Sequence, residues 1–373
     1  MKLDSLKLRN FRNYTKEKIN FSPHVNFIIG PNGSGKTNIV EAIYMLAITK
    51  TYKSMKEEHL VKRDEDHFLI KGVVERGTEK QSLSLYYDMT NKLAMINDDK
   101  VPKLSDYIGN LNVILFSPED LNLIKGQPGG RRKFINLEIG QINRAYLKLM
   151  HEYNKVLKNR NEYLKNKKTI DGLYIETLNE QLAELGGQVY KYRFKFIDDI
   201  NKELESIFKS FHGKGSLVMK YEANTLITEF NDESKDILLE KLNSSINQDS
   251  LRGGTTYGPH RDDFSLFLDD ENIKLSASQG QIRLATLALK CAEINLFKVA
   301  TGEDPIILLD DLFSELDKVK VKNILKFIKD DSQIIITTTD LDGINQRLLK
   351  KSKIFEIENK RGNVKIKTEE MRN

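Results

Sequence analysis

Residues 30–37 read GPNGSGKT and match the phosphate-binding pattern G-x-x-x-x-G-K-[ST] at every fixed position. Its glycines allow a tight loop whose backbone N–H groups point at one anion. We expect Lys36 to bridge the β- and γ-phosphates of a nucleotide and Thr37 to bind Mg²⁺. The predicted nucleotide-binding residues of this loop are Gly30, Pro31, Asn32, Gly33, Ser34, Gly35, Lys36 and Thr37.

A second candidate set lies near the C-terminal end, where residues 305–317 read PIILLDDLFSELD. The apolar run 306–309 is typical of a buried parallel strand, which would present Asp310 and Asp311 at its carboxyl end. We expect Asp310 to bind Mg²⁺ through a water molecule and Asp311 to polarise the attacking water as a general base. An Asp-Asp helix cap competes with this interpretation for the segment alone, but the phosphate-binding loop favours the metal site.

A third candidate, residues 276–289, reads SASQGQIRLATLAL. Ser278, Gly280 and Gln281 precede an apolar helical pattern, and a Ser-Gly pair at a helix start is a possible anion site. No strand precedes the segment closely enough for it to cradle the same phosphates as residues 30–37. Two interpretations stay open: an ordinary capped helix, which the segment alone favours, and a contact with the γ-phosphate bound on a second subunit.

The elements that flank the first loop fit its chemistry. Residues 25–30 predict a buried strand and residues 38–48 a helix, so that strand, glycine loop and helix follow in order. The remainder is mixed α/β, with three antiparallel strands, two further strands joined by a turn, a helix and another parallel core strand. The three antiparallel strands are 67–75, 81–87 and 92–97. The two further strands are 215–221 and 263–268, with their turn at 269–272. The helix is 319–329, and the parallel core strand is 332–338.

Two long amphipathic patterns predict a helical hairpin. The first, 142–163, repeats apolar residues at steps of three and four, and Arg160 is its one interruption. The second, 178–211, follows a polar turn and contains Gly186 and Gly187, which we expect to weaken or bend the helix by about 1 kcal/mol each. A hairpin arm is therefore expected between the phosphate-binding loop and the other two candidate segments.

In this order, the three motifs resemble the ATP-binding-cassette (ABC) ATPases. Residues 6–43 are similar to the heads of the SMC-type chromosome and repair ATPases. Three further segments resemble the RecF family of bacterial DNA repair proteins, and the resemblance covers nearly the whole length. They are FSPEDLNLIKGQPGGRRKFIN (116–136), TTYGPHRDDF (255–264) and LLDDLFSELD (308–317).

The resemblance implies a fold, a division into domains and two cofactors. The fold is α/β, an ABC/SMC-type P-loop ATPase head with a mixed sheet, plus an inserted α-helical hairpin arm domain. The head halves are 1–130 and 251–373, and the arm is 131–250. The cofactors are ATP and Mg²⁺, and the implied activity is a weak DNA-dependent hydrolysis of ATP.

The resemblance also assigns roles in the third segment and beyond it. Ser278, Gly280 and Gln281 match the cassette signature, which acts in trans across an ATP-dependent homodimer, so Ser278 joins the catalytic residues. Residues 314–317 match the D-loop that meets the partner's P-loop. Asp311 stands where many cassettes have Glu, and its shorter side chain fits slow turnover.

Two further roles stay open between neighbouring residues. Glu119 or Asp120 falls in the region of the Q-loop, which senses the γ-phosphate and the metal. Transporter cassettes place a switch histidine after a strand equivalent to 332–338, but this chain has no histidine beyond His260. Its candidates there are two threonines, Thr338 and Thr339.

The basic residues are unevenly distributed. The chain carries a formal net charge of +5, whereas residues 131–168 hold eleven Lys or Arg against three Glu. A basic stripe is the electrostatic footprint of nucleic-acid binding, although an isolated charge run is usually a solvated helix face. With an ATPase of this type, we favour DNA. The predicted DNA contacts are Lys53, which stands where Arg is expected in a DNA-sensing loop, and Arg131, Arg132, Lys133, Lys148, Lys155 and Lys158.

The composition limits the class of protein. The 373 residues are 39% hydrophobic and 30% charged, which is ordinary for a globular protein, and no apolar run approaches the length of a membrane span. The N-terminal residues lack a signal-peptide pattern, and the single Cys291 excludes an internal disulfide and is expected to be a small core residue. We therefore expect a cytoplasmic protein with no membrane partner.

The resemblance implies a biological setting. The protein would bind gapped, single-stranded and double-stranded DNA, act with RecO and RecR, and assist RecA loading in gap repair, replication restart and SOS induction. Two alternatives remain: the ATP-binding subunit of an ABC transporter, and a non-enzymatic scaffold with a decayed ATP site. The missing switch histidine and the basic hairpin argue against the first, and intact Lys36, Thr37, Asp310 and Asp311 argue against the second.

Overall fold

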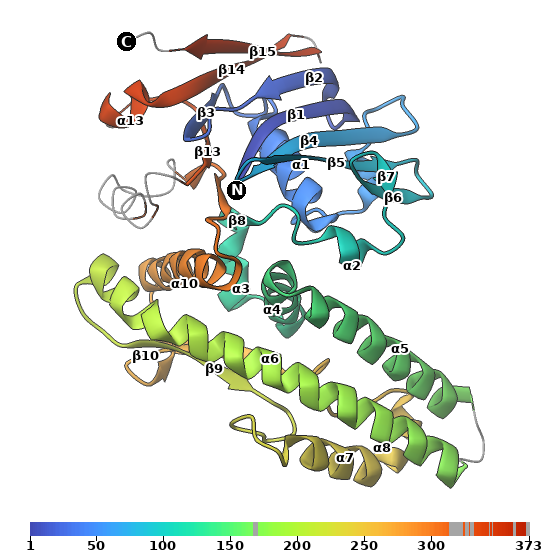
Figure 1. Ribbon diagram of the computed structural model, residues 1–373. Coiled ribbons are helices and arrows are strands. Elements are labelled where there is room, and N and C mark those ends of the chain that lie inside the picture. The colour runs from blue at the N-terminus through green and yellow to red at the C-terminus, as the bar shows by residue number, and fades with distance from the viewer. Residues whose placement is uncertain are drawn as a thin grey trace. The chain divides into compact units, whose positions relative to one another are not determined.

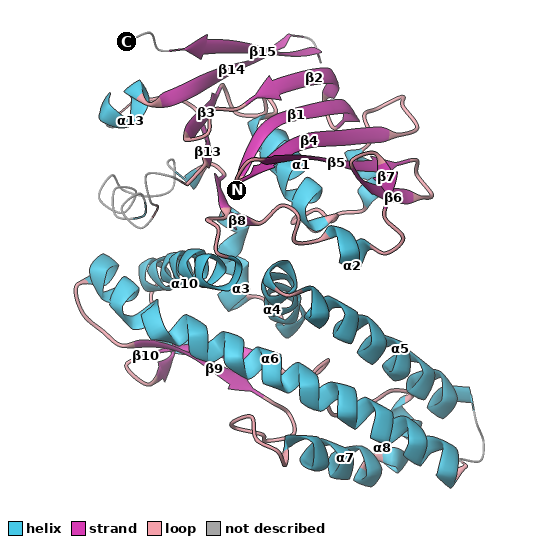
Figure 2. Ribbon diagram, viewed as in Figure 1, coloured by secondary structure: helices cyan, strands magenta, loops and turns pink. Residues whose placement is uncertain are grey.

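The computed structural model describes residues 1–166, 171–312, 324, 328, 332–342, 344, 346–360 and 363–370. The chain divides into two compact units, Met1–Asp120 with Leu289–Asn373, and Leu121–Ala288. Strands gather in the first unit and long helices in the second (Figure 2). The structural division falls at residues 120 and 288, whereas the domain boundaries at 130 and 250 stay a prediction.

One sheet of the first unit is antiparallel. Along β4, buried and half-buried residues alternate, which is typical of a sheet that packs one face against a core. The strands predicted at 67–75, 81–87 and 92–97 are three of its members. In spatial order the sheet contains β2 (Tyr14–Asn20), β1 (Lys2–Phe11), β4 (Phe68–Arg76), β5 (Glu79–Tyr87), β6 (Lys92–Ile96) and β7 (Asp99–Lys100).

The other sheet of this unit is mixed, as predicted. It consists of five parallel strands and one antiparallel edge strand, and every residue of β8, β12 and β13 is buried. Continuous apolar runs are typical of such strands because both faces of the sheet are covered. In spatial order the strands are β15 (Asn363–Glu370), β14 (Ser352–Lys360), β3 (Val25–Ile29), β13 (Ile334–Thr338), β12 (Ile306–Leu309) and β8 (Val113–Phe116).

The helices of the first unit are mostly short. The exception is α1, which follows β3 and buries eleven of its thirteen residues. The long helix α10 (Gln279–Thr301) begins in the second unit and ends in the first, and it carries Cys291, which is buried as expected. Helix α1 spans Lys36–Ile48. The short helices are η1 (Glu57–Leu60), α2 (Leu104–Tyr107), η2 (Pro118–Asp120) and α13 (Gln346–Lys350). The helix predicted at 319–329 lies almost wholly outside the described residues.

The second unit is built on the predicted helical hairpin (Figure 1). Helices α5 (Arg144–Asn166) and α6 (Gly172–His212) pack together, and a small antiparallel sheet of β9 (Leu217–Glu222), β10 (Asp263–Leu268) and β11 (Glu271–Asn272) lies within the same unit. The remaining helices are α3 (Leu121–Lys125), α4 (Pro128–Ile142), α7 (Ser234–Ser244), α8 (Ile246–Arg252) and α9 (Ile273–Ser276). No helix among the described residues has the length and apolar content that crossing a bilayer requires.

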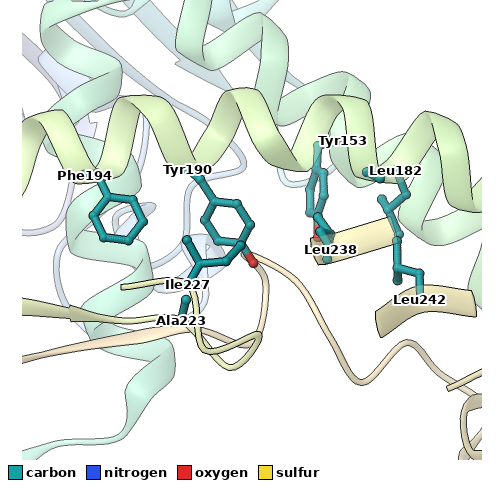
Figure 3. Close-up of a cluster of buried hydrophobic side chains, with 9 residues drawn as sticks. Tyr153, Leu182, Tyr190, Phe194, Ala223, Ile227, Leu238 and Leu242 are labelled. Carbon is teal, nitrogen blue, oxygen red and sulfur yellow. The ribbon is translucent and has the colours of Figure 1, made fainter. Parts of the chain in front are cut away.

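An apolar cluster joins α5, α6 and α7 (Figure 3). It includes Tyr153 of α5, Tyr190 of α6 and Leu238 of α7, all of them fully buried. Helix α6 runs unbroken through Gly186, where an added Cβ would lie 2.4 Å from Leu238 Cδ2. The glycine therefore lets α7 approach α6 closely, and this packing offsets the weak helix propensity that the sequence showed.

The interruption in the α5 seam is a buried ion pair. Arg160 is fully buried, and its Nη1 atom lies 2.7 Å from Asp249 Oδ2 of α8. The same guanidinium donates to Asn179 Oδ1 at 2.6 Å and to Thr255 Oγ1 at 2.8 Å. Because a buried charge is tolerated only when it is paired and hydrogen-bonded, Arg160 fixes where α6, α8 and the segment around residue 255 meet α5.

Replacing Arg160 tests this junction. We expect Arg160→Met to lower the free energy of unfolding by about 3–5 kcal/mol, because Asp249 stays buried without its cationic partner. Lys158→Met is the matched control: Lys158 lies on the same helix and is 74% exposed, so its loss should cost about 0.5 kcal/mol or less. Urea unfolding followed by circular dichroism measures both, and equal stabilities of the two variants would contradict the assigned role.

Candidate nucleotide site

The phosphate-binding loop connects β3 to α1 at the carboxyl edge of the mixed sheet. Gly33 and Gly35 have positive φ values of 77° and 115°, which a residue with a side chain adopts only under strain. A Cβ at Gly35 would also lie 2.6 Å from Asn13 Nδ2. The loop thus requires glycine for two separate reasons, one conformational and one steric.

The loop has the donors that a phosphate group requires. Lys36 is 3% exposed, and its ammonium group donates to the Gly30 and Pro31 carbonyl oxygens at 2.8 and 3.1 Å. The Ser34 hydroxyl is buried without a hydrogen-bond partner in the described part of the chain. The first turn of α1 holds no acidic residue, so no carboxylate of the helix itself competes for its positive dipole end. This cradle fits a nucleotide phosphate.

The turn between β1 and β2 holds the loop from outside, which sequence analysis missed. Asn13 Nδ2 donates to the Ser34 carbonyl oxygen at 3.2 Å, and Tyr14 donates its hydroxyl to the Gly35 carbonyl oxygen at 3.1 Å. Asn38 Nδ2 of α1 donates to Asn13 Oδ1 at 2.8 Å. An Asn-Tyr pair after a strand is ordinary turn composition, so no local signal marks this contact.

Thr37 and Asp310, the two residues predicted to bind Mg²⁺, lie close together. The Asp310 carboxylate follows β12 and accepts a hydrogen bond at Oδ1 from Thr337 Oγ1 at 2.8 Å. The Tyr52 hydroxyl donates to Oδ2 at 2.9 Å, and the Thr37 hydroxyl of α1 lies near enough to lower the pKa of the carboxyl group. Burial raises the pKa of Asp310, and these hydrogen bonds oppose the rise. Sequence analysis did not identify Tyr52 or Thr337.

The oxygen donors here suit Mg²⁺. No group of three or more His, Cys, Asp or Glu that would hold a metal alone occurs among the described residues. Mg²⁺ usually keeps several waters and takes one or two protein oxygens together with substrate phosphates. The hydroxyl of Thr37 and the carboxylate of Asp310, beside a phosphate cradle, fit that pattern, and Mg²⁺ would supply positive charge to the phosphates there.

Asp311 is held beside the metal residues by the same threonine. Its backbone adopts a left-handed φ of 49°, and its N–H donates to Thr337 Oγ1 at 2.8 Å. The two threonines predicted to replace the switch histidine lie elsewhere: Thr338 Oγ1 donates to the Asp340 carbonyl oxygen and Thr339 Oγ1 to Asp340 Oδ2. Thr337 is therefore the threonine that touches both aspartates.

The structure separates the two Q-loop candidates. Asp120 Oδ2 accepts a hydrogen bond from the Ser117 N–H at 2.6 Å, and burial raises the pKa of Asp120 to about 6, while the Lys290 cation opposes the rise. Glu119 is exposed, and its charge contributes to the raised pKa of the Tyr52 hydroxyl, which contacts Asp310. Asp120 caps its own turn, so Glu119 is the better candidate for the sensor.

The start of α10 is an exposed capping box. Ser278 Oγ accepts from the Gln281 N–H at 3.3 Å, and Gln281 Oε1 accepts from the Ser278 N–H at 2.9 Å. Ser278 and Gly280 are both exposed to solvent. The ordinary capped helix is thus present, and its exposed face also leaves these residues open to a second molecule. The predicted D-loop, 314–317, lies outside the described residues.

The prediction that Arg131 contacts DNA is wrong. Arg131 is 5% exposed and forms a two-pronged ion pair with Asp263, with both N–O distances at 2.7 Å. Its remaining terminal nitrogen donates to three carbonyl oxygens at the end of α3, including that of Gly126 at 2.9 Å. The guanidinium is a structural clamp, because its donors are already used inside the second unit.

The other predicted DNA residues differ in exposure. Arg132 is half-buried and donates to the Asp262 carbonyl oxygen at 2.9 Å. Lys53 is also half-buried, and its ammonium lies 5.6 Å from the centre of the Tyr52 ring. The remaining four are exposed on α4 and α5, namely Lys133, Lys148, Lys155 and Lys158.

Comparison with known proteins finds relatives that match nearly the whole chain. The sequence profile of the RecF/RecN/SMC N-terminal domain family matches residues 2–364. The chain is 41% identical over 367 residues to the DNA replication and repair protein RecF of Ligilactobacillus salivarius, with 96% of each chain covered. It is 40% identical over 371 residues to the protein of the same name from Streptococcus pneumoniae, with 98% of this chain and 99% of that protein covered.

Solved structures give the same result. The recombination mediator protein RecF with ATP, of the RecFOR pathway, matches with a TM-score of 0.90 at 31% identity, over 98% of this chain and 97% of that chain. An SMC head bound to the C-terminal winged-helix domain of ScpA matches with a TM-score of 0.55 at 16% identity, over 100% of this chain and 99% of that chain. The second likeness shows the fold alone. The predicted ABC/SMC-type α/β head is confirmed.

A substitution of Thr337 tests the link between the aspartates. Thr337→Val keeps the side-chain shape but removes the donor to Asp310 and the acceptor for the Asp311 N–H, so we expect ATP hydrolysis to fall about tenfold or more. Thr338→Val is the neighbouring comparison and should retain most of the activity, because the Thr338 hydroxyl bonds to Asp340 instead. Phosphate release under saturating ATP measures both, and the reverse order of effects would restore Thr338 as the switch candidate.

Proposed function

The chain belongs to the RecF family of DNA replication and repair proteins, and we propose that it binds and hydrolyses ATP to control a hold on DNA. One observation carries the proposal: β3, which leads into the phosphate cradle, and β12, which leads into the buried Asp310, both pair in parallel with β13, so both halves of a nucleotide site meet at one sheet edge. Family membership sets aside the transporter alternative. The scaffold alternative does not explain why a buried carboxylate is held ready by several hydroxyl donors.

Each residue has a role in this mechanism. Loop N–H groups and the Lys36 ammonium bind the triphosphate, and Lys36 exchanges its carbonyl partners for phosphate oxygens. Thr37 and Asp310 would hold Mg²⁺, which would supply positive charge to the phosphates. Asp311 accepts a proton from the attacking water, and Glu119 orients that water or the γ-phosphate. Slow turnover follows from the short reach of Asp311.

The site is completed by a second copy of the chain. Ser278, Gly280 and Gln281 lie at an exposed helix start, where N–H groups and a hydroxyl suit the γ-phosphate bound on a partner. Two heads would enclose two ATP molecules, and hydrolysis would separate them. Such a protein acts as a clamp or timer and not as a motor.

DNA is the proposed ligand of the exposed face of α5. Lys148, Lys155 and Lys158 are separated by seven and three residues, which places them on one side of the helix. Two carboxylates share this side of the helix: Glu152, four residues after Lys148, and Glu162, which lies 3.7 Å from Lys158. We further propose that the protein favours gapped DNA, acts in the cytoplasm with RecO and RecR, and assists RecA in gap repair, replication restart and SOS induction.

The first test concerns ATP-dependent dimerisation. We expect Lys36→Met to abolish the ATP-dependent rise in mass, because the variant lacks the cation that bridges the β- and γ-phosphates. Lys16→Met, at an exposed position of β2, is the control and should dimerise like the parent chain. Sedimentation velocity with and without ATP measures the mass. An unchanged profile for Lys36→Met would reject the proposed dimer mechanism.

The second test concerns the DNA surface. Reversing Lys148, Lys155 and Lys158 to Glu should weaken duplex binding and flatten its salt dependence, because each lost phosphate contact removes about 0.9 from the log–log slope. The matched control reverses three exposed lysines of the antiparallel sheet, Lys7, Lys16 and Lys18. Fluorescence anisotropy over a salt series gives both slopes. A slope equal to that of the parent chain would move the DNA surface away from α5.

A further inference from the structure

Tyr52 lies in the loop 49–56, directly after α1, and contacts the metal-binding carboxylate. We propose that Tyr52 is a positioning residue for Asp310 and that it links the surface of this loop to the affinity of the site for Mg²⁺. The inference rests on the proposed function, since it assigns a regulatory contact to the same ATP site. Its first support is geometric: Tyr52 and Thr337 hold the two different oxygens of Asp310 at 2.9 and 2.8 Å.

A carboxylate held at both oxygens has a fixed plane. The Thr337 hydroxyl comes from the neighbouring strand β13 and holds Oδ1, so Tyr52 decides the direction of Oδ2. The Tyr52 ring is itself fixed, because it packs edge-on against Tyr44 of α1 with centroids 5.3 Å apart and planes at 79°. Partners that orient a metal ligand typically change metal affinity by about 10–100-fold when they are removed.

The residue before Tyr52 ties the loop to α1. Thr51 Oγ1 donates to Glu41 Oε1 at 2.6 Å and accepts from the Lys53 N–H at 3.1 Å. Glu41 is fully buried, and Arg12 binds its carboxylate with two hydrogen bonds of 2.9 Å each. These bonds tie the residues on both sides of Tyr52 to α1, so the position of the Tyr52 ring depends on the conformation of residues 51–53.

Lys53 gives the loop a point of contact with an anion. Its ammonium lies 5.6 Å from the centre of the Tyr52 ring and is half-buried. A cation over an aromatic face is held by the ring's negative quadrupole, and a phosphate group competes for the same ammonium with a full charge. A nucleic-acid phosphate at Lys53 would withdraw the cation from the ring and alter the hold of Tyr52 on Asp310.

Mg²⁺ titration of ATP binding tests the positioning role. The intact chain is mixed with a fluorescent ATP analogue, and the Mg²⁺ concentration that gives half-maximal binding is measured. Tyr52→Phe, which removes only the hydroxyl, should raise that concentration about tenfold and leave binding in EDTA unchanged. Tyr86→Phe is the matched control, since it makes the same change on β5 and should behave like the parent chain. An unchanged midpoint in Tyr52→Phe overturns the positioning role.

The same Mg²⁺ titration, repeated with duplex DNA, tests the proposed link between the surface of the loop 49–56 and the Mg²⁺ affinity of the site. In the parent chain, DNA should change the Mg²⁺ concentration for half-maximal ATP binding by about twofold or more. This change should vanish in Tyr52→Phe and in Lys53→Met. Lys53→Met keeps the Tyr52 hydroxyl, so it tests the link even where the first variant folds poorly. A DNA shift that survives in both variants overturns the link. A parent chain that binds no ATP at any Mg²⁺ concentration rejects the proposed function instead.

Discussion

One buried carboxylate sets the geometry of the candidate site. Asp310 is 3% exposed, and a charge in that position is costly unless donors surround it. Thr337 of β13 and Tyr52 of the loop after α1 donate hydrogen bonds to its two oxygens, and the Thr37 hydroxyl of α1 lies near enough to lower the pKa of the carboxyl group. The requirement to satisfy one group therefore constrains the relative placement of all three elements.

The register of the parallel strands places Thr337 beside Asp310. Leu309 of β12 pairs with Ile336 of β13, and the next residues in each strand are Asp310 and Thr337. On the other side, Thr338 pairs with Ile29 of β3, so the phosphate loop begins at the same level of the sheet. Because side chains alternate between faces, a slip of one residue would turn Thr337 away from Asp310. The parallel sheet thus aligns phosphate cradle and metal residues together.

The second unit satisfies buried charges in the same manner. Arg193 of α6 is 1% exposed and donates to the Tyr221 hydroxyl at 2.7 Å and to the Pro259 carbonyl oxygen at 2.6 Å. Arg160 and Arg131 are paired with Asp249 and Asp263. Arg193 and Arg160 join the hairpin to the segment 255–264 and to α8, and Arg131 joins α4 to Asp263, so the exposed lysines of α5 are presented on a scaffold fixed from within.

Sequence patterns predicted the elements better than the contacts between them. The phosphate loop, the strand before it, the helix after it and the hairpin could be recognised because spacing and glycine placement are local properties. Tyr52 and Asn13 could not, because their partners lie far along the chain or depend on the exact path of a turn. The choice between Glu119 and Asp120 needed a capping hydrogen bond that no spacing rule shows. Arg131 was misjudged because a charge run does not reveal which of its members face inward.

That last error has a physical consequence for the basic segment. Two of the eleven basic residues at 131–168, Arg131 and Arg160, are neutralised by the aspartates Asp263 and Asp249, which lie far outside the segment. Their charges contribute little to the field outside the protein, since each is compensated within hydrogen-bonding distance. The net charge counted along the sequence therefore overstates what DNA would meet. The exposed lysines of α4 and α5 supply the attraction for DNA. The proposed DNA surface is therefore narrower than the charge run that suggested it.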